Sequence, residues 1–196
     1  MPQEIDMSEN IFTDLSELAY RGPDVIIGKT VRFRKPERVR IGSHSIIDDF
    51  TYISCGLTIG QYTHIGAGGV LIGGTAHINI GNFVNIAPGC RIIAASNNFT
   101  EGGLVGPTIP PEFSGEPIIG DISIEDYVLF GTGTVILPNC HIPEGLSTGA
   151  MTLITSNMKL EPWTLYIGTP ARPVKKRESA STLESARNLL SCQRGI

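Results

Sequence analysis

The side chains of this sequence best able to take up a proton near neutral pH are its four histidines, His44, His64, His77 and His141. His44, His64 and His77 include no closely spaced pair, so they do not have the pattern of three converging imidazoles that holds zinc. The four cysteines form no CxxC motif and no Cys/His cluster. The pattern favours proton transfer over metal chemistry, and we expect no metal.

The composition indicates frequent turns and few helices. The chain has 196 residues, enough to bury a sizeable core, and we expect one domain. Glycine (23) and proline (13) are abundant, and only 7% of the residues are aromatic. A formal net charge of −4 gives no indication of nucleic-acid binding.

The sequence shows no targeting or membrane-spanning segment. No stretch reaches the roughly 18 consecutive apolar residues that a membrane span requires. No basic, apolar, small-residue leader opens the chain. Together with the scattered cysteines, these features predict a reduced, cytoplasmic protein without a membrane span.

An apolar residue recurs at every sixth position through most of the chain. The register contains Ile41, Ile47, Ile53, Ile59, Ile65, Leu71, Ile80, Ile86, Ile92, Ile118, Ile124, Phe130, Ile136, Ile142, Thr148, Ile154 and Leu160. It slips by three residues after Leu71 and is interrupted after Ile92, and Thr148 is its one polar member. A period of six fits neither a helix nor an ordinary hairpin sheet, but it fits short strands joined by corners. A β-sandwich with chance periodicity would have to explain sixteen apolar residues in seventeen register positions, so the sequence predicts a solenoid.

Small or β-branched side chains follow four positions after the register residues, where they can stack inside a narrow prism. These are Ser45, Thr51, Thr63, Thr75, Val84, Cys90, Ser96, Val128, Thr134, Cys140 and Thr152.

Three segments depart from the repeat and set the expected domain boundaries. Residues 8–20 have apolar side chains at helical spacing and predict a short helix within an N-terminal capping segment, residues 1–24. The solenoid then covers residues 25–177, and the Gly- and Pro-rich residues 94–117 form a long loop of the kind that is usually functional. The tail, residues 178–196, is expected to be helical near its end, packed on a neighbour or mobile.

The repeat resembles the hexapeptide-repeat acyltransferases, and the second half resembles the branch that contains the galactoside, maltose and polysaccharide O-acetyltransferases. The run PIIGDISIEDYVLFGTGTVILPNCHIPEGLSTGAMTLIT is similar to the coils of that branch, which end in a Gly-Ala corner. The segment YIGTPARPVKKR resembles its closing Gly-Asn-Pro-Ala-basic signature, with Thr169 in the Asn place. The loop at 94–117 interrupts the repeats where the family has its active-site loop.

The resemblance implies an all-β fold, a left-handed parallel β-helix, assembled as a homotrimer with active sites between adjacent subunits. It also implies acetyl-CoA as co-substrate, with the pantetheine arm lying along small corners of the C-terminal coils. The matching corner residues are Gly131, Thr132, Gly133, Gly149 and Ala150. Small residues let a ligand approach the backbone, although the same residues are also ordinary solenoid corners.

The closing signature supplies the residues expected at the other end of CoA. By resemblance, Pro170 and Ala171 lie near the adenine, while Arg172 and Lys175 contact its phosphates. A run of basic residues is otherwise most often a solvated face.

The expected catalytic base is where this sequence departs from the resemblance. Acylation of a hydroxyl requires a base, and the maltose and galactoside enzymes have a histidine just as the loop begins. Asn97 occupies that place here, and an amide cannot act as a base. His64, at the edge of a coil and facing outward, is our first candidate, and His77, in the three-residue slip, is the second. Asn97 and Asn98 are candidates for binding a sugar hydroxyl.

These observations leave the function open between three classes. The main expectation is acetyl-CoA-dependent O-acetylation of a saccharide, in the synthesis of a cell-surface polysaccharide. The alternative is N-acetylation of an amino sugar carried on a nucleotide, because an amine has a neutral, nucleophilic fraction and can do without a strong base. A zinc site like that of the γ-carbonic anhydrases, which share the solenoid, is a further alternative that the histidine spacing disfavours.

Overall fold

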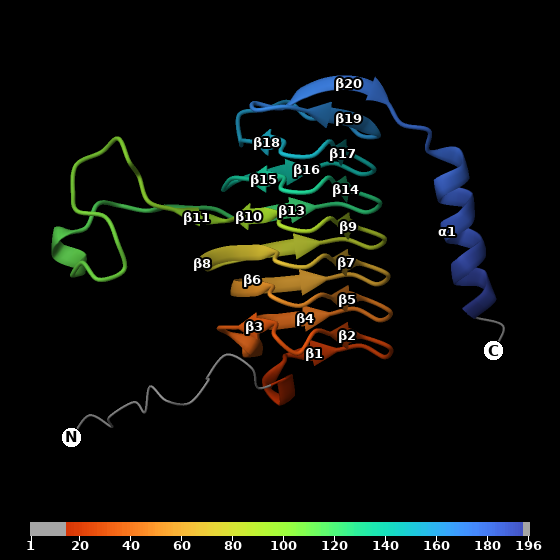
Figure 1. Cartoon of the computed structure of the whole chain (residues 1–196), viewed down its shortest axis with the longest axis horizontal. Helices are drawn as coiled ribbons and strands as arrows, with labels where there is room; N and C mark the ends of the chain where they lie inside the picture. Colours follow the sequence, from red (N-terminus) through yellow and green to blue (C-terminus); the bar gives the residue numbers. More distant parts are fainter. Residues whose placement is uncertain (1–14, 194–196) are drawn as a thin grey trace.

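The computed structural model describes residues 15–193 as a stack of short strands that coil around one core (Figure 1). Register residues of successive coils lie side by side: Ile47 pairs with Ile65, three hexapeptides later, and Ile65 pairs with Ile86 across the three-residue slip. Ile86 then pairs with Phe130, on the far side of the long loop. The predicted parallel β-solenoid is confirmed.

Two large sheets form the walls of the stack. The eight-stranded sheet contains β2 (Ile26–Ile27), β5 (Ile46–Ile47), β7 (His64–Ile65), β9 (Asn85–Ile86), β14 (Leu129–Phe130), β17 (Ser147–Thr148), β19 (Thr164–Ile167) and β20 (Arg172–Lys176). The ten-stranded sheet contains β1 (Tyr20–Arg21), β3 (Arg32–Phe33), β4 (Val39–Ile41), β6 (Tyr52–Ile59), β8 (Val70–Ile80), β10 (Arg91–Ile93), β13 (Ile122–Ile124), β15 (Val135–Ile136), β16 (His141–Ile142) and β18 (Leu153–Ile154). Pairing within both sheets is parallel, except that β20 folds back antiparallel on β19.

The core is the column of register residues, as predicted. Ile41, Ile65, Ile86 and Ile142 have no exposed surface, and most of the small residues four positions later are buried beside them. Thr148, the polar member, is accommodated because its hydroxyl bonds with that of Thr134 at 2.8 Å and accepts the backbone N–H of Gly131.

One register prediction is wrong. Ile118 is 44% exposed, because it belongs to β12 (Ile118–Ile119), which pairs antiparallel with β11 (Ala95–Ser96) outside the solenoid. The coil resumes only at Ile122. Apolar spacing alone does not reveal that the chain is still returning from the loop at Ile118.

Each coil turns two of its corners with residues in the left-handed backbone region. At one corner, five aromatic residues have φ between 49° and 61°, and each ring stacks on the next with ring centroids 4.7–5.8 Å apart. They are His44, Tyr62, Phe83, Tyr127 and Trp163. We call this the aromatic column. It joins successive coils through offset ring stacking, which adds to the area that the rings bury.

The opposite end of the eight-stranded sheet turns at a second column, which we call the glycine corner. It comprises residues 48–50, 66–68, 87–89, 131–133 and 149–151. Backbone hydrogen bonds from Gly68 to Asp49, from Gly89 to Ala67 and from Gly133 to Pro88 show that its members lie directly above one another.

The third corner, which we call the loop corner, carries the irregular segments. In β8 the register against β6 shifts between Ser54 and Gly56, where residues 73–76 bulge outward, which confirms the distortion expected around His77. One coil further, the chain leaves the stack after Ala94 and returns at Gly120, whose N–H donates to the Ala94 carbonyl. The loop contains the 3-10 helix η3 (Pro111–Phe113) and extends away from the solenoid (Figure 1).

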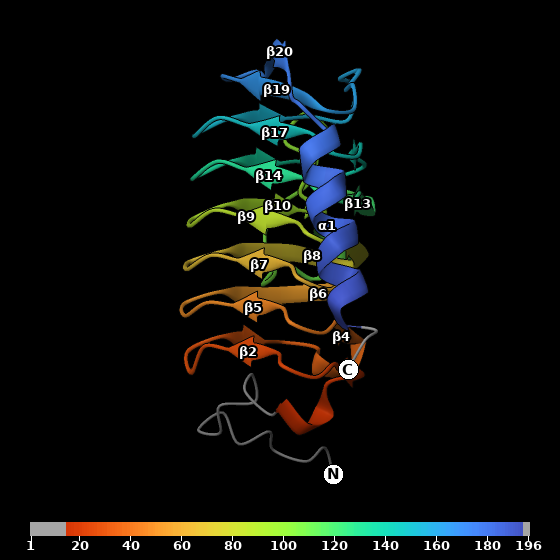
Figure 2. The same ribbon diagram turned by 90° about the vertical axis from the view of Figure 1, so that its right-hand side faces the viewer.

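The ends of the described chain flank the stack. The helix expected over residues 8–20 lies mostly outside the described residues, which begin with the 3-10 helix η1 (Leu15–Glu17) and enter strand β1 at Tyr20, ahead of residue 25. A second 3-10 helix, η2 (Pro36–Arg38), connects β3 with β4. The tail forms α1 (Ala180–Gln193), which runs alongside the coils (Figure 2). Within residues 15–193, no helix has the length and apolar character needed to cross a bilayer.

Candidate active site

The small residues predicted to line the CoA groove all lie on the glycine corner. The stacking of coils accounts for several of them. A Cβ on Gly131 would lie 2.6 Å from the Gly149 carbonyl carbon, a Cβ on Gly149 would lie 2.8 Å from the Ile167 side chain, and Gly133 has φ +70. Close approach of the next coil therefore requires these glycines, and it also leaves the backbone of Thr132 and Ala150 at a bare edge.

A groove of about 390 Å³ lies at the C-terminal end of the stack. Its lining is Thr155, Asn157, Met158, Lys159, Tyr166, Pro170, Ala171, Arg172 and Pro173. Pro170, Ala171 and Arg172, the residues predicted to contact the adenine and phosphates of CoA, line this groove together with Lys159. Sequence analysis missed Lys159 because it lies in the last coil, seven residues before the closing signature begins at Tyr166. Lys175 is exposed on β20 opposite Leu165, and it does not line this groove.

His64 faces outward from β7 on the eight-stranded sheet, two residues before the glycine corner. Its Nε2 lies 2.9 Å from Oδ2 of Asp48, and its Nδ1 lies 3.0 Å from Oδ1 of Asn85. Asp48 and Asn85 come from the coils on either side, so three consecutive coils contribute to this cluster. A hydrogen-bond partner therefore occupies each ring nitrogen, and neither is open to an acceptor hydroxyl.

His77 lies at the loop corner, away from the sheet that holds His64. Its Nε2 is 2.9 Å from Oγ1 of Thr58, and its backbone N–H donates to Oδ1 of Asp121 at 2.7 Å. Burial and the neighbouring Arg38 guanidinium hold the pKa of His77 below its usual value, against the opposing effect of Asp121. The two candidate bases are not brought together within one chain.

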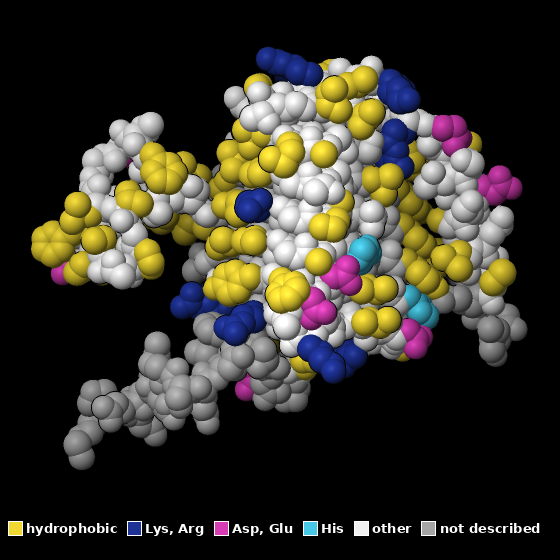
Figure 3. Space-filling model, viewed as in Figure 1, with side chains coloured by type: hydrophobic (Ala, Val, Ile, Leu, Met, Phe, Trp, Pro, Cys, Tyr) yellow, Lys and Arg dark blue, Asp and Glu magenta, His cyan; other side chains and the backbone are white. Residues whose placement is uncertain are grey.

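Asn97 and Asn98 lie where the loop leaves the solenoid. Oδ1 of Asn98 accepts the backbone N–H and the hydroxyl of Thr100, so its carbonyl oxygen holds the turn of the loop. Beyond this turn the loop exposes large apolar side chains, among them Phe99 (80% exposed) and Phe113 (61%). Figure 3 shows hydrophobic side chains gathered on the loop and on the neighbouring edge of the solenoid.

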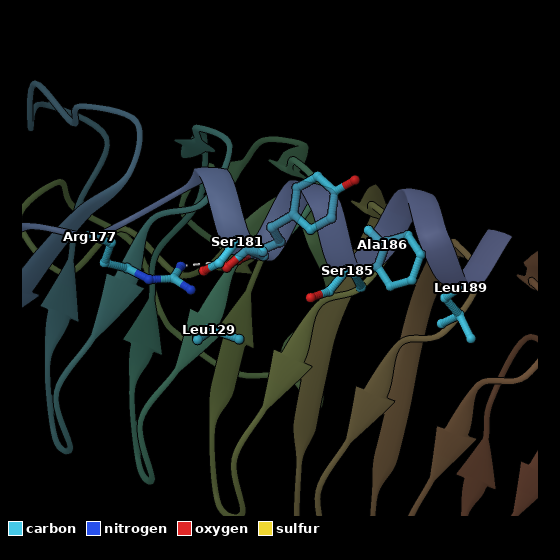
Figure 4. Close-up of a pocket in the computed structure, with 9 residues that line it drawn as sticks. Leu129, Arg177, Ser181, Ser185, Ala186 and Leu189 are labelled. Atoms are coloured by element: carbon cyan, nitrogen blue, oxygen red, sulfur yellow. Dashed lines mark hydrogen bonds between the residues drawn. The ribbon is translucent and has the colours of Figure 1, made fainter. Parts of the chain in front are cut away.

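A second groove, of about 470 Å³, lies between α1 and the aromatic column. Figure 4 shows Arg177 at one end and Leu189 toward the other, with Leu129 on the solenoid side. Nη1 of Arg177 donates to the carbonyl oxygens of Tyr127 and Gly145, and its guanidinium lies over the Trp163 ring. Arg177 therefore anchors the start of α1, and this groove contains none of the predicted site residues.

The remaining histidines are held by separate partners. His44 lies in the aromatic column, 3.3 Å from an Asp24 carboxylate oxygen. His141 contacts Ser123 at 2.8 Å and Glu125 at 3.3 Å on the exterior of the ten-stranded sheet. Among the described residues, no three metal-ligating side chains converge on one point.

Comparisons with known proteins place this geometry in a family. No family model matches the chain. The chain is 27% identical over 168 residues to a dTDP-4-amino-4,6-dideoxy-D-glucose acyltransferase of Escherichia coli, covering 83% of this chain and 85% of the relative. It is also 30% identical over 145 residues to a carbonic anhydrase of Geobacillus kaustophilus, covering 72% of this chain and 75% of the relative.

Among solved structures, the chain superposes on AntD, an N-acyltransferase from Bacillus cereus in complex with dTDP and 3-hydroxybutyryl-CoA, with a TM-score of 0.85. The two are 31% identical, and the match covers 95% of this chain and all of AntD. A serine-to-cysteine variant of AntD was solved with dTDP-4-amino-4,6-dideoxyglucose and Coenzyme A.

The fold, together with a match that covers almost the whole of both chains, defines a β-solenoid enzyme that transfers acyl groups. The chain belongs to the hexapeptide-repeat acyltransferases, as the repeat and the closing signature predicted.

Proposed function

We propose that this enzyme transfers an acyl group from an acyl-CoA to the amino group of a nucleotide-linked amino sugar. The observation that carries the proposal is the match to AntD, because it covers 95% of this chain and all of AntD. The Escherichia coli relative is an acyltransferase of a dTDP-linked amino sugar, and AntD was solved with a dTDP-linked amino sugar bound. The alternative acceptor considered from the sequence is thus favoured over a sugar hydroxyl.

The environment of His64 supports an amine acceptor. A hydroxyl must lose its proton near the transition state, which requires a base with an open lone pair. Asp48 and Asn85 occupy both ring nitrogens of His64, and Asn97 stands where the O-acetylating relatives have histidine. A neutral amine attacks the thioester carbonyl without prior deprotonation, so it does not need that base.

The reaction balances without a further reagent. The amine nitrogen forms a bond to the acyl carbon, the carbon–sulfur bond breaks, and sulfur leaves as the CoA thiolate. The proton lost by the nitrogen ends on that thiolate, because a thiolate, whose thiol has a pKa of about 8.5, is a far better proton acceptor than the amide that forms. The products are the N-acylated sugar nucleotide and free CoA.

The glycine corner adjoins the C-terminal groove, because Thr169, next to the groove residue Pro170, donates a hydrogen bond to the carbonyl oxygen of Met151. Together they suit CoA. The small corner residues Gly131 and Thr132, and Gly149 and Ala150 in the next coil, let the amide groups of the pantetheine arm approach the backbone. The cationic pair Lys159 and Arg172 at the C-terminal groove supplies partners for the phosphates. Acetyl-CoA remains our proposed donor, with 3-hydroxybutyryl-CoA as the second donor to test because AntD was solved with it.

The assembly and location that we propose follow from the same features. The exposed apolar side chains of the loop, including Phe99 and Phe113, fit a homotrimer in which the loop contacts a neighbouring copy. All four cysteines are free, and three of them are buried, which supports a reducing, cytoplasmic location.

A panel of acceptors tests the proposal. The purified enzyme is incubated with acetyl-CoA or 3-hydroxybutyryl-CoA and either dTDP-4-amino-4,6-dideoxyglucose or dTDP-glucose, and the product mass and attachment atom are determined. We expect an amide product from the amino sugar only. Ester formation on dTDP-glucose at a comparable kcat/KM would restore the O-acetylation hypothesis.

A further inference from the structure

Two cations meet on one carbonyl group at the loop corner. Nζ of Lys35 donates to the Gly74 carbonyl oxygen at 3.2 Å, and Nη1 of Arg38 donates to the same oxygen at 3.3 Å. Nη2 of Arg38 donates to the Thr75 carbonyl oxygen at 3.0 Å. The helix η2 places the two side chains side by side, and the bulge of β8 turns its carbonyls toward them.

Neither cation of this pair forms an ion pair with a carboxylate among the described residues. The ion pairs found among residues 15–193 involve other groups, so Lys35 and Arg38 have only uncharged oxygen partners there. Two like charges on one acceptor repel each other, and the arrangement becomes favourable when an anion binds between them. Guanidinium and ammonium groups are the usual partners of phosphate esters.

Gly56 makes room for this cluster. A Cβ at position 56 would lie 2.4 Å from Nδ1 of His77 and 2.8 Å from Nη2 of Arg38. The imidazole and the guanidinium therefore converge over the bare backbone of Gly56. The only carboxylate that contacts His77 among the described residues is Asp121, which accepts its backbone N–H.

The cluster lies beside the root of the long loop. Asp121 follows Gly120, where the chain returns from residues 94–117, and it binds His77 directly. The cluster is also far from the groove that we propose for the CoA phosphates. β4 and β20 lie near opposite ends of the stack (Figure 1), so the two cationic sites are separate.

Building on the proposed function, we propose that Lys35 and Arg38 bind the diphosphate of the nucleotide-linked acceptor. Each side chain keeps donors that the carbonyls of Gly74 and Thr75 do not use, and a diphosphate offers several acceptor oxygens and two negative charges. The glycine corner precedes β6 at residues 48–50, and the loop corner lies midway along β6, at the register shift between Ser54 and Gly56, so the two corners are separate edges of the coil. In the proposed homotrimer, an acceptor held at the loop corner of one copy would meet a thioester held at the glycine corner of another.

Isothermal titration calorimetry on the full-length protein tests the site with dTDP, UDP and CoA as separate probes. We expect the double variant Lys35→Gln/Arg38→Gln to raise the Kd for dTDP by about 10-fold to 100-fold. The factor should be the same for UDP, because the contact is to phosphate, and the Kd for CoA should stay within twofold. Lys29→Gln, which removes one exposed charge in the first coil just after β2, is the matched control and should leave all three values unchanged.

A second variant guards against misfolding and against a different role for the cluster. Gly56→Ala should weaken dTDP binding, because the added Cβ displaces His77 and Arg38. The double variant Lys35→Gln/Arg38→Gln should keep the oligomer size and melting temperature of the wild type. An unchanged Kd for dTDP, or an equal loss for CoA, would overturn the assignment. Loss of the oligomer in the double variant would instead mark the cluster as a contact between copies and would also overturn it.

The activity assay separates this inference from the proposed function. If the wild type acylates the amino sugar nucleotide and the double variant keeps its KM for that acceptor, the diphosphate lies elsewhere and the proposed function stands. If the wild type binds dTDP through this cluster but forms no amide product, the site stands and the proposed function fails.

Discussion

Asn85 lies beside His64 on the adjacent strand of the eight-stranded sheet, with its Oδ1 atom 3.0 Å from Nδ1 of His64. Because Asp48 holds the other ring nitrogen, this contact gives His64 a structural role across three coils. It also gives a direct test of the amine acceptor.

Replacement of His64 by Ala should lower kcat on the amino sugar nucleotide by less than about tenfold, since a positioned general base is worth about 10²–10⁴-fold and an amine does not require one. Steady-state kinetics at saturating acyl-CoA measure this. The acyl-CoA KM serves as the control and should not change. A loss beyond a hundredfold in a folded variant would identify His64 as the base and would count against the amine acceptor.

Two isoleucines of the same sequence register should differ sharply in their contribution to stability. Ile86→Ala removes a side chain with no exposed surface and should cost about 2–5 kcal/mol of unfolding free energy. Ile118→Ala, on the exposed strand β12, should cost less than about 0.5 kcal/mol. Urea unfolding of the two variants measures both, and equal losses would show that β12 belongs to the solenoid.

The cationic pair at the C-terminal groove should affect the donor rather than the acceptor. Lys159→Ala combined with Arg172→Ala should raise the acyl-CoA KM roughly tenfold, because two charge-assisted contacts to phosphate are lost, and should leave the acceptor KM within twofold. Lys175→Ala is the control, since Lys175 is exposed on the same strand as Arg172 but outside the groove. An acyl-CoA KM that moved only with Lys175 would shift the phosphate site onto the outer face of β20.

Alkylation of the cysteines should distinguish the core from the tail. Burial raises the pKa of Cys55 to about 12 and that of Cys140 to about 11, and it raises the pKa of Cys90 as well. At pH 8 these thiols stay protonated and shielded, so iodoacetamide should modify only the exposed Cys192 in the native protein. Mass spectrometry counts the adducts, and denatured protein should take up four. Rapid native labelling of Cys55 would contradict its place in the core.

The interior of this protein could be predicted from the sequence because every coil repeats the same local rule. A residue six positions after Ile59 is again buried, at Ile65, whatever the rest of the chain does. Thr148 fits the rule despite its hydroxyl, because the hydroxyl of Thr134, in the preceding coil, bonds with it. The rule fails at Ile118, where the chain returning from the loop pairs with β11 before it rejoins the stack.

The contacts between side chains of different coils depend on the tertiary structure. The spacing placed His64 on an outer face, but it could not show that Asp48 and Asn85 occupy both ring nitrogens, since those partners come from the coils on either side. In the sequence, Lys35 and Arg38 look like ordinary surface charges. In the structure, the bulge of β8 places the Gly74 carbonyl, almost forty residues away in the sequence, next to both side chains. The sequence by itself determined the solenoid, because a buried apolar side chain recurs at every sixth position. The stacking of coils decided the site, because neighbours across the stack are distant in the sequence and their distance varies with each slip and loop.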